Sequence, residues 1–179
     1  PQRAASTARE DSALTHPNPV CIDACAAYAA AIAAGIAGAS PDAMREAALA
    51  QASKTHAASA ARAAIERGAA GELPADFESG AGAVLTALQN AFYQLFHAPG
   101  VEEGIIATVH LGADTDTNAA IAGALLGAAH GKGAFPSRWV LPLLACRPLA
   151  GAGAPRPRAY AYWPDDALDL AEALVKDAM

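Results

Sequence analysis

Two carboxylates and two hydroxyls follow one another closely in the segment Gly112-Ala-Asp-Thr-Asp-Thr-Asn118. If Gly112 makes a turn and a helix begins near Asp116, the carboxylates of Asp114 and Asp116 converge on the helix N-terminus. The hydroxyls of Thr115 and Thr117 add neutral oxygen donors. Oxygen ligands suit Mg²⁺ or Mn²⁺, whereas zinc prefers nitrogen and sulfur. The segment is therefore a candidate divalent-metal site, in which water, substrate or another segment must complete the octahedral shell.

A helix start without any metal is the simpler interpretation of the same residues. Asp and Thr are preferred N-cap residues, and short motifs have many chance matches. A DxD loop also occurs in nucleotide-sugar transferases, but there it follows a strand, and this region is expected to be helical. The local pattern alone does not decide between a cap and a metal site.

The flanking residues resemble a known family. Val109-His-Leu-Gly-Ala-Asp-Thr-Asp-Thr-Asn-Ala-Ala-Ile-Ala-Gly-Ala-Leu-Leu-Gly-Ala-Ala-His-Gly131, followed by Phe135-Pro-Ser-Arg-Trp139, is similar to the ADP-ribosylglycohydrolases. Their usual form is a GGDTDT loop, a helix of small residues and then G…IP..W. Here Ala113 replaces the second glycine and Phe135 the isoleucine. Alanine at position 113 is strained if the loop needs a positive φ there.

The resemblance extends toward the N-terminus and covers nearly the whole chain, although it is most specific over 109–139. The segment 77–88 resembles the family stretch that contributes backbone to the ligand cleft. The segment 12–19 resembles the family's THP.P stretch, whose histidine faces ADP-ribose.

Membership would imply an orthogonal bundle of helices around a cleft with two divalent metals, Mg²⁺ or Mn²⁺. Such enzymes hydrolyse the glycosidic bonds of ADP-ribosylated proteins or small molecules. The metals orient the ribose and lower the pKa of a bound water. The resemblance implies these roles: metal ligands Asp114, Asp116 and Thr117, of which Asp114 and Asp116 are also catalytic, and ligand contacts His16, Gly80, Gly82 and Gly112.

The family's other metal ligands come from a TDDT-type segment that this sequence lacks. Asp165 and Asp166 follow Trp163-Pro164 and are not that motif. We therefore expect the C-terminal portion of such a domain, with half of the metal shell, completed by an N-terminal fragment or a second chain and inactive alone. The alternative is a non-catalytic ADP-ribose-binding or structural, crystallin-like relative, or an inactive fragment.

Composition predicts the elements that must position these residues. Of 179 residues, 54% are hydrophobic, many of them alanine, and only 6% are aromatic, which favours one all-α domain over residues 1–179. Ser40-Pro41-Asp42 is a helix-start signal. Helices are expected at 20–37, 41–67, 84–96, 101–109, 116–131, 136–144 and 165–175. Outside them lie the polar opening segment 1–18, a loop at 69–78 and the irregular linker 147–158.

Charge and cysteine content bear on partners and location. The net charge of −6 argues against nucleic acid or an anionic membrane as a partner. The longest apolar run, 119–129, is too short to cross a bilayer, and no signal peptide is visible. Three cysteines form no disulfide framework, so a reduced, cytoplasmic setting is expected. Cys21 and Cys25 share a helix face; a soft-metal site is conceivable there, but core packing is preferred.

Overall fold

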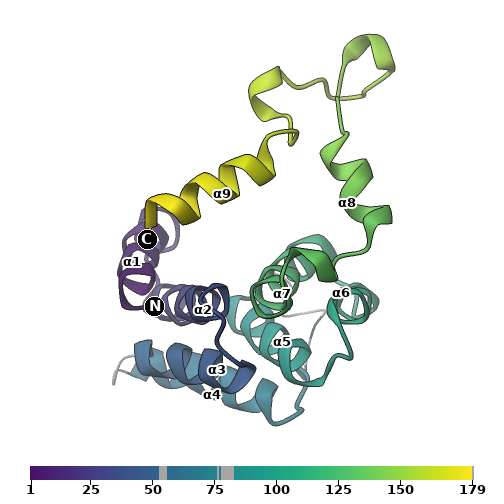
Figure 1. Cartoon of the computed structure of the whole chain (residues 1–179). Helices are drawn as coiled ribbons and strands as arrows, with labels where there is room; N and C mark the ends of the chain where they lie inside the picture. The colour runs from purple at the N-terminus through teal and green to yellow at the C-terminus, as the bar shows by residue number, and fades with distance from the viewer. Residues whose placement is uncertain (53–55, 76, 78–82, 179) are drawn as a thin grey trace. The chain divides into compact units, whose positions relative to one another are not determined.

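The computed structural model describes residues 1–52, 56–75, 77 and 83–178, which contain α-helices and short 3-10 helices but no β-strand (Figure 1). The predicted all-α fold class is therefore confirmed. The α-helices are α1 (Gln2–Thr15), α2 (Pro19–Ile36), α3 (Pro41–Gln51), α4 (His56–Ala69), α5 (Val84–His97), α6 (Val101–His110), α7 (Thr115–His130), α8 (Ser137–Leu144) and α9 (Ala167–Ala178). The 3-10 helices are η1 (Lys132–Ala134), η2 (Ala150–Ala152) and η3 (Tyr160–Tyr162).

The chain divides into two compact units, residues 1–134 and residues 135–179. The first contains α1 to α7 and η1, and the second contains α8, α9, η2 and η3. The expectation of one domain over residues 1–179 stays a prediction.

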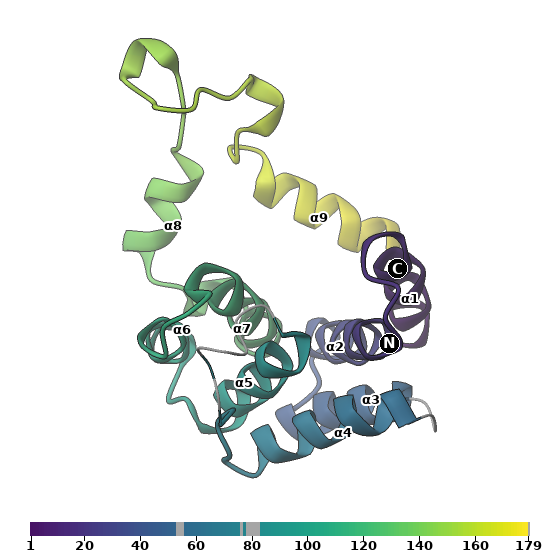
Figure 2. The ribbon, with the colours of Figure 1, turned by 180° about the vertical axis from the view of Figure 1, so that it is seen from behind.

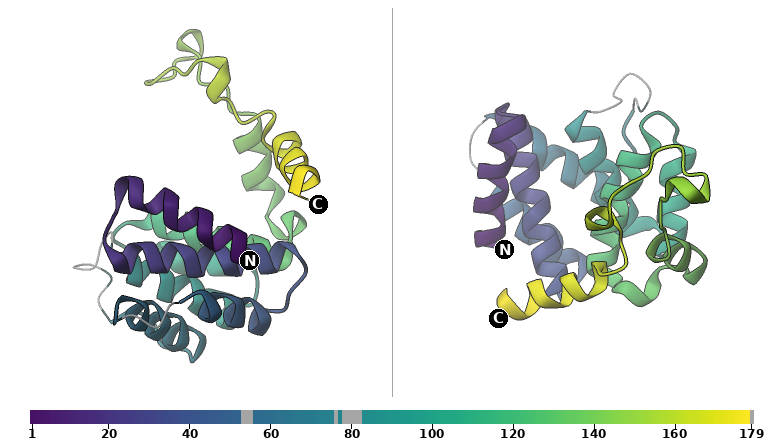
Figure 3. Two further views of the ribbon diagram at one scale, coloured as in Figure 1. Left: turned by 90° about the vertical axis from the view of Figure 1, so that its left-hand side faces the viewer. Right: turned by 90° about the horizontal axis from the view of Figure 1, so that it is seen from above.

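Helix α2 is the central element of the first unit. It packs against α1, α3, α4, α5 and α7, and Figure 3 shows α1 lying alongside it. This is possible because its buried face is built from small residues such as Ala24, Ala27 and Ala31, which let helix backbones approach closely. By length and composition alone α2 could also cross a membrane, unlike the run 119–129. A core helix passes the same test, and 44% of α2 is buried inside the protein.

Larger side chains fill the core around α5, which lies between α4 and α7 (Figure 2). Leu88, Phe92 and Leu95 of α5 are buried, as the apolar spacing predicts. Helix α4 approaches α5 so closely at Gly68 that a Cβ there would overlap the carbonyl oxygen of Gln89. Glycine at this position therefore sets the distance between the two helices.

The starts of α2 and α3 follow local capping rules. The side chain of Asn18 accepts a hydrogen bond from the Val20 amide at 2.9 Å, and Ser40 Oγ accepts one from the Ala43 amide at 3.3 Å. Proline occupies the first turn of both helices, where its missing N–H costs nothing. The predicted helix start at residues 40–42 is confirmed.

The prediction of one helix over 41–67 is wrong. Helix α3 ends at Gln51, and α4 begins at His56. The last carbonyls of α3 accept hydrogen bonds from the guanidinium groups of two arginines outside this helix. Arg9 donates to the Gln51 oxygen at 2.5 Å and Arg62 to the Leu49 oxygen at 2.7 Å. Positive charge at a helix C-terminus also complements the helix dipole. These contacts satisfy carbonyls that a longer helix would have bonded internally.

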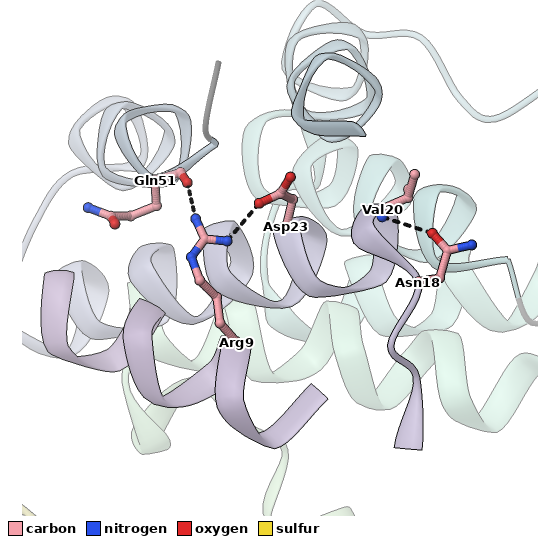
Figure 4. Close-up of polar contacts among 5 residues, drawn as sticks. All are labelled: Arg9, Asn18, Val20, Asp23 and Gln51. Carbon is pink, nitrogen blue, oxygen red and sulfur yellow. Dashed lines mark hydrogen bonds and ion pairs between the residues drawn. The ribbon is translucent and has the colours of Figure 1, made fainter. Parts of the chain in front are cut away.

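The prediction that residues 1–18 lie outside the helices is wrong, because most of this polar segment forms helix α1. Ala5 is buried with Ala26 and Ala30 of α2. Arg9 Nη1 contacts a carboxylate oxygen of Asp23 at 2.6 Å, and Asp23 is only 6% exposed (Figure 4). Contacts with α2 thus hold α1 in place, although α1 has little apolar periodicity of its own.

The second unit, taken by itself, has small local contacts in its linker. Arg147 pairs with Asp165 at 3.4 Å and stacks over the Trp163 ring. Trp163 Nε1 donates to the Arg158 carbonyl at 3.1 Å. The predicted irregular linker 147–158 is therefore joined to the residues just before α9.

Candidate functional site

A cavity of about 410 Å³ lies within the first unit. Its walls come from the end of α1, the first half of α2, the start of α5 and the start of α7. Its volume is in the range of pockets that hold small molecules. The apolar part of its wall is formed by Ala24, Ala83, Val84, Ala87, Leu88 and Ile121.

The predicted metal loop leads directly to this cavity. Gly112 and Ala113 both have positive φ, 82° and 58° respectively. This pair of left-handed residues turns the chain from α6 into α7, which begins at Thr115, one residue before the predicted start. The turn brings Asp114 to the N-cap position of α7.

Asp114 does not act as an ordinary helix cap. Its side chain makes no capping hydrogen bond, although it occupies the N-cap position. Instead it is half-buried and lines the cavity together with Thr117 and Asn118. The simple capping interpretation therefore does not account for this carboxylate.

Asp116 occupies a different environment from Asp114. It is exposed and is not among the residues that line the cavity. Its place in the first turn of α7 complements the positive end of the helix dipole. The structure therefore brings one of the two predicted carboxylates into the cavity wall.

His16 reaches the same cavity from the end of α1. Its ring Nδ1 lies 2.9 Å from Thr15 Oγ1, which leaves Nε2 for other partners. When the Thr15 hydroxyl donates to Nδ1, the ring proton is on Nε2 and that atom can donate to a ligand oxygen. His16, Asp114 and Thr117 thus share one cavity although they are far apart in sequence.

The chain matches a known protein family over nearly its whole length. The family model for ADP-ribosylglycohydrolase matches residues 1–178. The chain belongs to the ADP-ribosylglycohydrolase family. No curated protein and no solved structure gave a significant match to it. Membership confirms the resemblance and points to a hydrolase of the glycosidase kind.

The glycine positions that the ADP-ribosylglycohydrolase resemblance singles out have separate outcomes. Gly112 forms the turn before Asp114 but is not among the cavity-lining residues. Gly80 and Gly82 lie outside the described residues, so their assignment as ligand contacts stays a prediction.

The residues at the start of α7 fit part of a hard-metal shell. Asp114 offers a carboxylate that caps nothing, and Thr117 and Asn118 offer neutral oxygens in the same wall. Mg²⁺ and Mn²⁺ prefer such donors. Among the described residues, no group of three or more His, Cys, Asp or Glu side chains could hold a metal. An ADP-ribosylglycohydrolase metal centre here would thus need ligands in addition to these.

Several cavity residues were assigned no site role from the sequence, although some of them lie in the segments 12–19 and 112–118. They include Asp11, Ser12 and Thr15 of α1, Tyr28 of α2 and Asn118 of α7. A helix over residues 2–15 would have placed Asp11 and Thr15 on one face by their four-residue spacing. A sequence-based prediction of helix α1 would therefore have identified the residues that α1 contributes to the cavity.

Ala113 stores backbone strain at the position where the ADP-ribosylglycohydrolase loop usually has glycine. Ala113→Gly should stabilise the first unit by about 0.5–1 kcal/mol, because a left-handed alanine costs roughly 1–2 kcal/mol and the entropy of glycine offsets part of that. Denaturant unfolding measures the change. Gly112→Ala is the matched control: nothing lies within 4 Å of its added Cβ, so only its φ of 82° opposes it, and stability should fall. If Ala113→Gly lowers the free energy of unfolding, the interpretation that Ala113 is strained is wrong.

Tyr28 predicts a pH dependence of stability. Its hydroxyl donates to the Ile121 carbonyl at 2.8 Å, and burial raises the pKa of Tyr28 from 10.0 to about 12. Folding therefore favours the neutral phenol. The stabilisation is fully present below pH 10 and is lost as the pH rises through about 12, amounting to about 2–3 kcal/mol. Unfolding free energies of the wild type and Tyr28→Phe across this window measure it. A parallel loss of stability in both proteins would contradict the prediction.

Proposed function

We propose that this chain takes part in hydrolysing the glycosidic bond of ADP-ribosylated proteins or small molecules, through a dinuclear Mg²⁺ or Mn²⁺ site of which it supplies half. The observation that carries the proposal is the shared cavity of Asp114, Thr117 and His16. The Asp114 side chain makes no capping hydrogen bond, so helix capping does not account for a carboxylate in a cavity of ligand size. Family membership points to a glycosidic bond, and the oxygen donors at the start of α7 are of the kind that Mg²⁺ and Mn²⁺ prefer.

Each residue of the site has a proposed part. Asp114 and Thr117 would hold the metal, and Asp116 would be a further carboxylate ligand from the first turn of α7. When bound, divalent metal supplies Lewis acidity and an activated water. The Nε2 atom of His16 donates to an oxygen of ADP-ribose. The apolar wall around Val84 and Leu88 packs against the less polar faces of the ligand.

The half-site leads us to propose that the chain alone does not turn over substrate. Two carboxylates and neutral oxygens leave an octahedral shell incomplete. The missing ligands would come from a segment of the Thr-Asp-Asp-Thr type, on an N-terminal fragment or a second chain. Metal-dependent release of ADP-ribose by this 179-residue chain in isolation would overturn the proposal that the chain supplies only half of the metal site.

Isothermal titration calorimetry with ADP-ribose tests the proposal. The titration is made in Mg²⁺, in Mn²⁺ and in chelator, for this chain alone and together with a family segment that carries Thr-Asp-Asp-Thr. We expect metal-dependent binding that is tighter in the mixture than with either component alone. Absence of ADP-ribose binding in every arm would overturn the proposed function.

A second candidate function is ADP-ribose binding without catalysis. It is favoured by the finding that no group of three acidic, histidine or cysteine side chains in the described ranges could hold a metal. Binding that is equally tight with chelator and with Mg²⁺ would support this function over hydrolysis.

A further inference from the structure

Two thiols that the proposed function does not use lie in the wall of the cavity. Cys21 and Cys25 are both free and half-buried, and both line the cavity with Asp114. Their four-residue spacing places them on one face of α2, one turn apart. Neither is among the fully buried residues of the core.

We propose that Cys21 and Cys25 form a modification site, at which mixed-disulfide formation with a small disulfide compound closes the cavity to its ligand. This inference rests on the proposed function for the identity of that ligand. In the reaction a cysteine loses its proton, and its thiolate attacks one sulfur of the disulfide compound. One new S–S bond to the protein forms, the S–S bond of the compound breaks, and one thiolate leaves. No further oxidant is required.

Helix geometry prevents the two cysteines from resolving the adduct between themselves. Residues four apart on a helix have Cβ atoms about 5–6 Å apart. A disulfide needs a Cβ separation of roughly 3.5–4.5 Å. As long as α2 stays helical, a mixed disulfide at either cysteine therefore persists until an external thiol removes it.

The size of the cavity makes such an adduct incompatible with a ligand. Its volume of about 410 Å³ is near the lower end of the range for small-molecule pockets. A glutathione-sized adduct on either cysteine would occupy the space that faces Asp114. An acidic adduct would also add negative charge beside Asp11 and Asp114, which opposes the binding of an anionic ligand.

Cys146 provides a control within the same chain. It is free and exposed, belongs to the unit of residues 135–179 and is not among the cavity-lining residues. Cys146→Ser leaves only the two cavity cysteines. The double variant Cys21→Ser/Cys25→Ser leaves only Cys146.

The experiment treats the folded full chain with glutathione disulfide and follows each adduct by peptide mass spectrometry. In Cys146→Ser, we expect modification of Cys21 or Cys25, loss of ADP-ribose binding, and recovery on adding dithiothreitol. ADP-ribose at ten times its Kd should slow this modification about tenfold, because about a tenth of the cavities remain free. In the double variant, modification of Cys146 should leave the affinity equal to that of the same variant before treatment.

The outcomes separate this inference from the proposed function. If neither cavity cysteine reacts in the folded chain, or if the modified cavity binds ADP-ribose unchanged, the modification site is overturned. If the untreated chain fails to bind ADP-ribose with every metal, the proposed function fails. In that case, adduct formation at Cys21 or Cys25 still decides whether the site can be modified.

Discussion

Asp114→Asn should weaken Mg²⁺-dependent binding of ADP-ribose at least about 100-fold, equivalent to about 2.7 kcal/mol. The negative charge of a carboxylate is what a hard divalent cation requires, and an amide of the same size lacks it. Asparagine is as good an N-cap residue as aspartate, so the start of α7 should be unaffected. Calorimetric titration of the wild type and the variant in Mg²⁺ measures the loss, and unfolding curves check that stability is unchanged.

Two further substitutions make this result specific. Asp42→Asn is the matched control, because Asp42 is in the first turn of α3, as Asp116 is in α7, and is not among the cavity-lining residues. It should leave ADP-ribose binding unchanged. Asp116→Asn tests the exposed carboxylate: a loss equal to that of Asp114→Asn indicates that both ligate metal. If Asp114→Asn binds ADP-ribose as the wild type does, the metal role is wrong and Asp114 only begins a helix.

The fold could be predicted from sequence wherever its causes are local. Small, strongly helix-forming residues indicate α2 and α7, and the spacing of Leu88, Phe92 and Leu95 indicates α5. Prolines and short polar side chains mark the starts of α2 and α3. The break after Gln51 could not be predicted this way, because it depends on a guanidinium 42 residues away in sequence. Helix α1 depends equally on contacts with α2 that no local pattern reveals.

The candidate site could likewise be predicted from sequence only in part. Asp114, Thr117 and His16 were predicted because they lie in motifs that a family resemblance can identify, and the cavity brings them together. Asp11, Tyr28 and the two cavity cysteines lie in no such motif. They become neighbours of Asp114 only through the packing of α1 and α7 against α2. The rest of a metal shell could not be predicted, because two carboxylates specify the kind of metal but not the source of its other ligands.

Arg9→Met should lower the free energy of unfolding by about 2–3 kcal/mol. Arg9 joins three helices: it belongs to α1, pairs with Asp23 of α2 and donates to the Gln51 carbonyl that ends α3 (Figure 4). Removing one partner of a buried ion pair typically costs about 3–5 kcal/mol, because the remaining charge stays in the interior. The side chain of Arg9 is 30% exposed, which reduces that cost, while that of Asp23 is only 9% exposed. Denaturant unfolding of the variant measures the change.

A second pair and a double variant distinguish this contact from ordinary surface charge. Asp42→Asn breaks the exposed pair with Arg45, whose atoms are 3.1 Å apart, and should cost at most about 0.5 kcal/mol. The double variant Arg9→Met/Asp23→Asn should lose less unfolding free energy than the sum of the losses of the two single variants. The reason is that the negative charge of Asp23, which Arg9 balances, is then also removed. Since His16 directly follows α1, Arg9→Met should also weaken ADP-ribose binding, whereas Asp42→Asn should not. Equal stability losses for Arg9→Met and Asp42→Asn would show that Arg9 acts as a surface charge, and that other contacts hold α1 against the cavity.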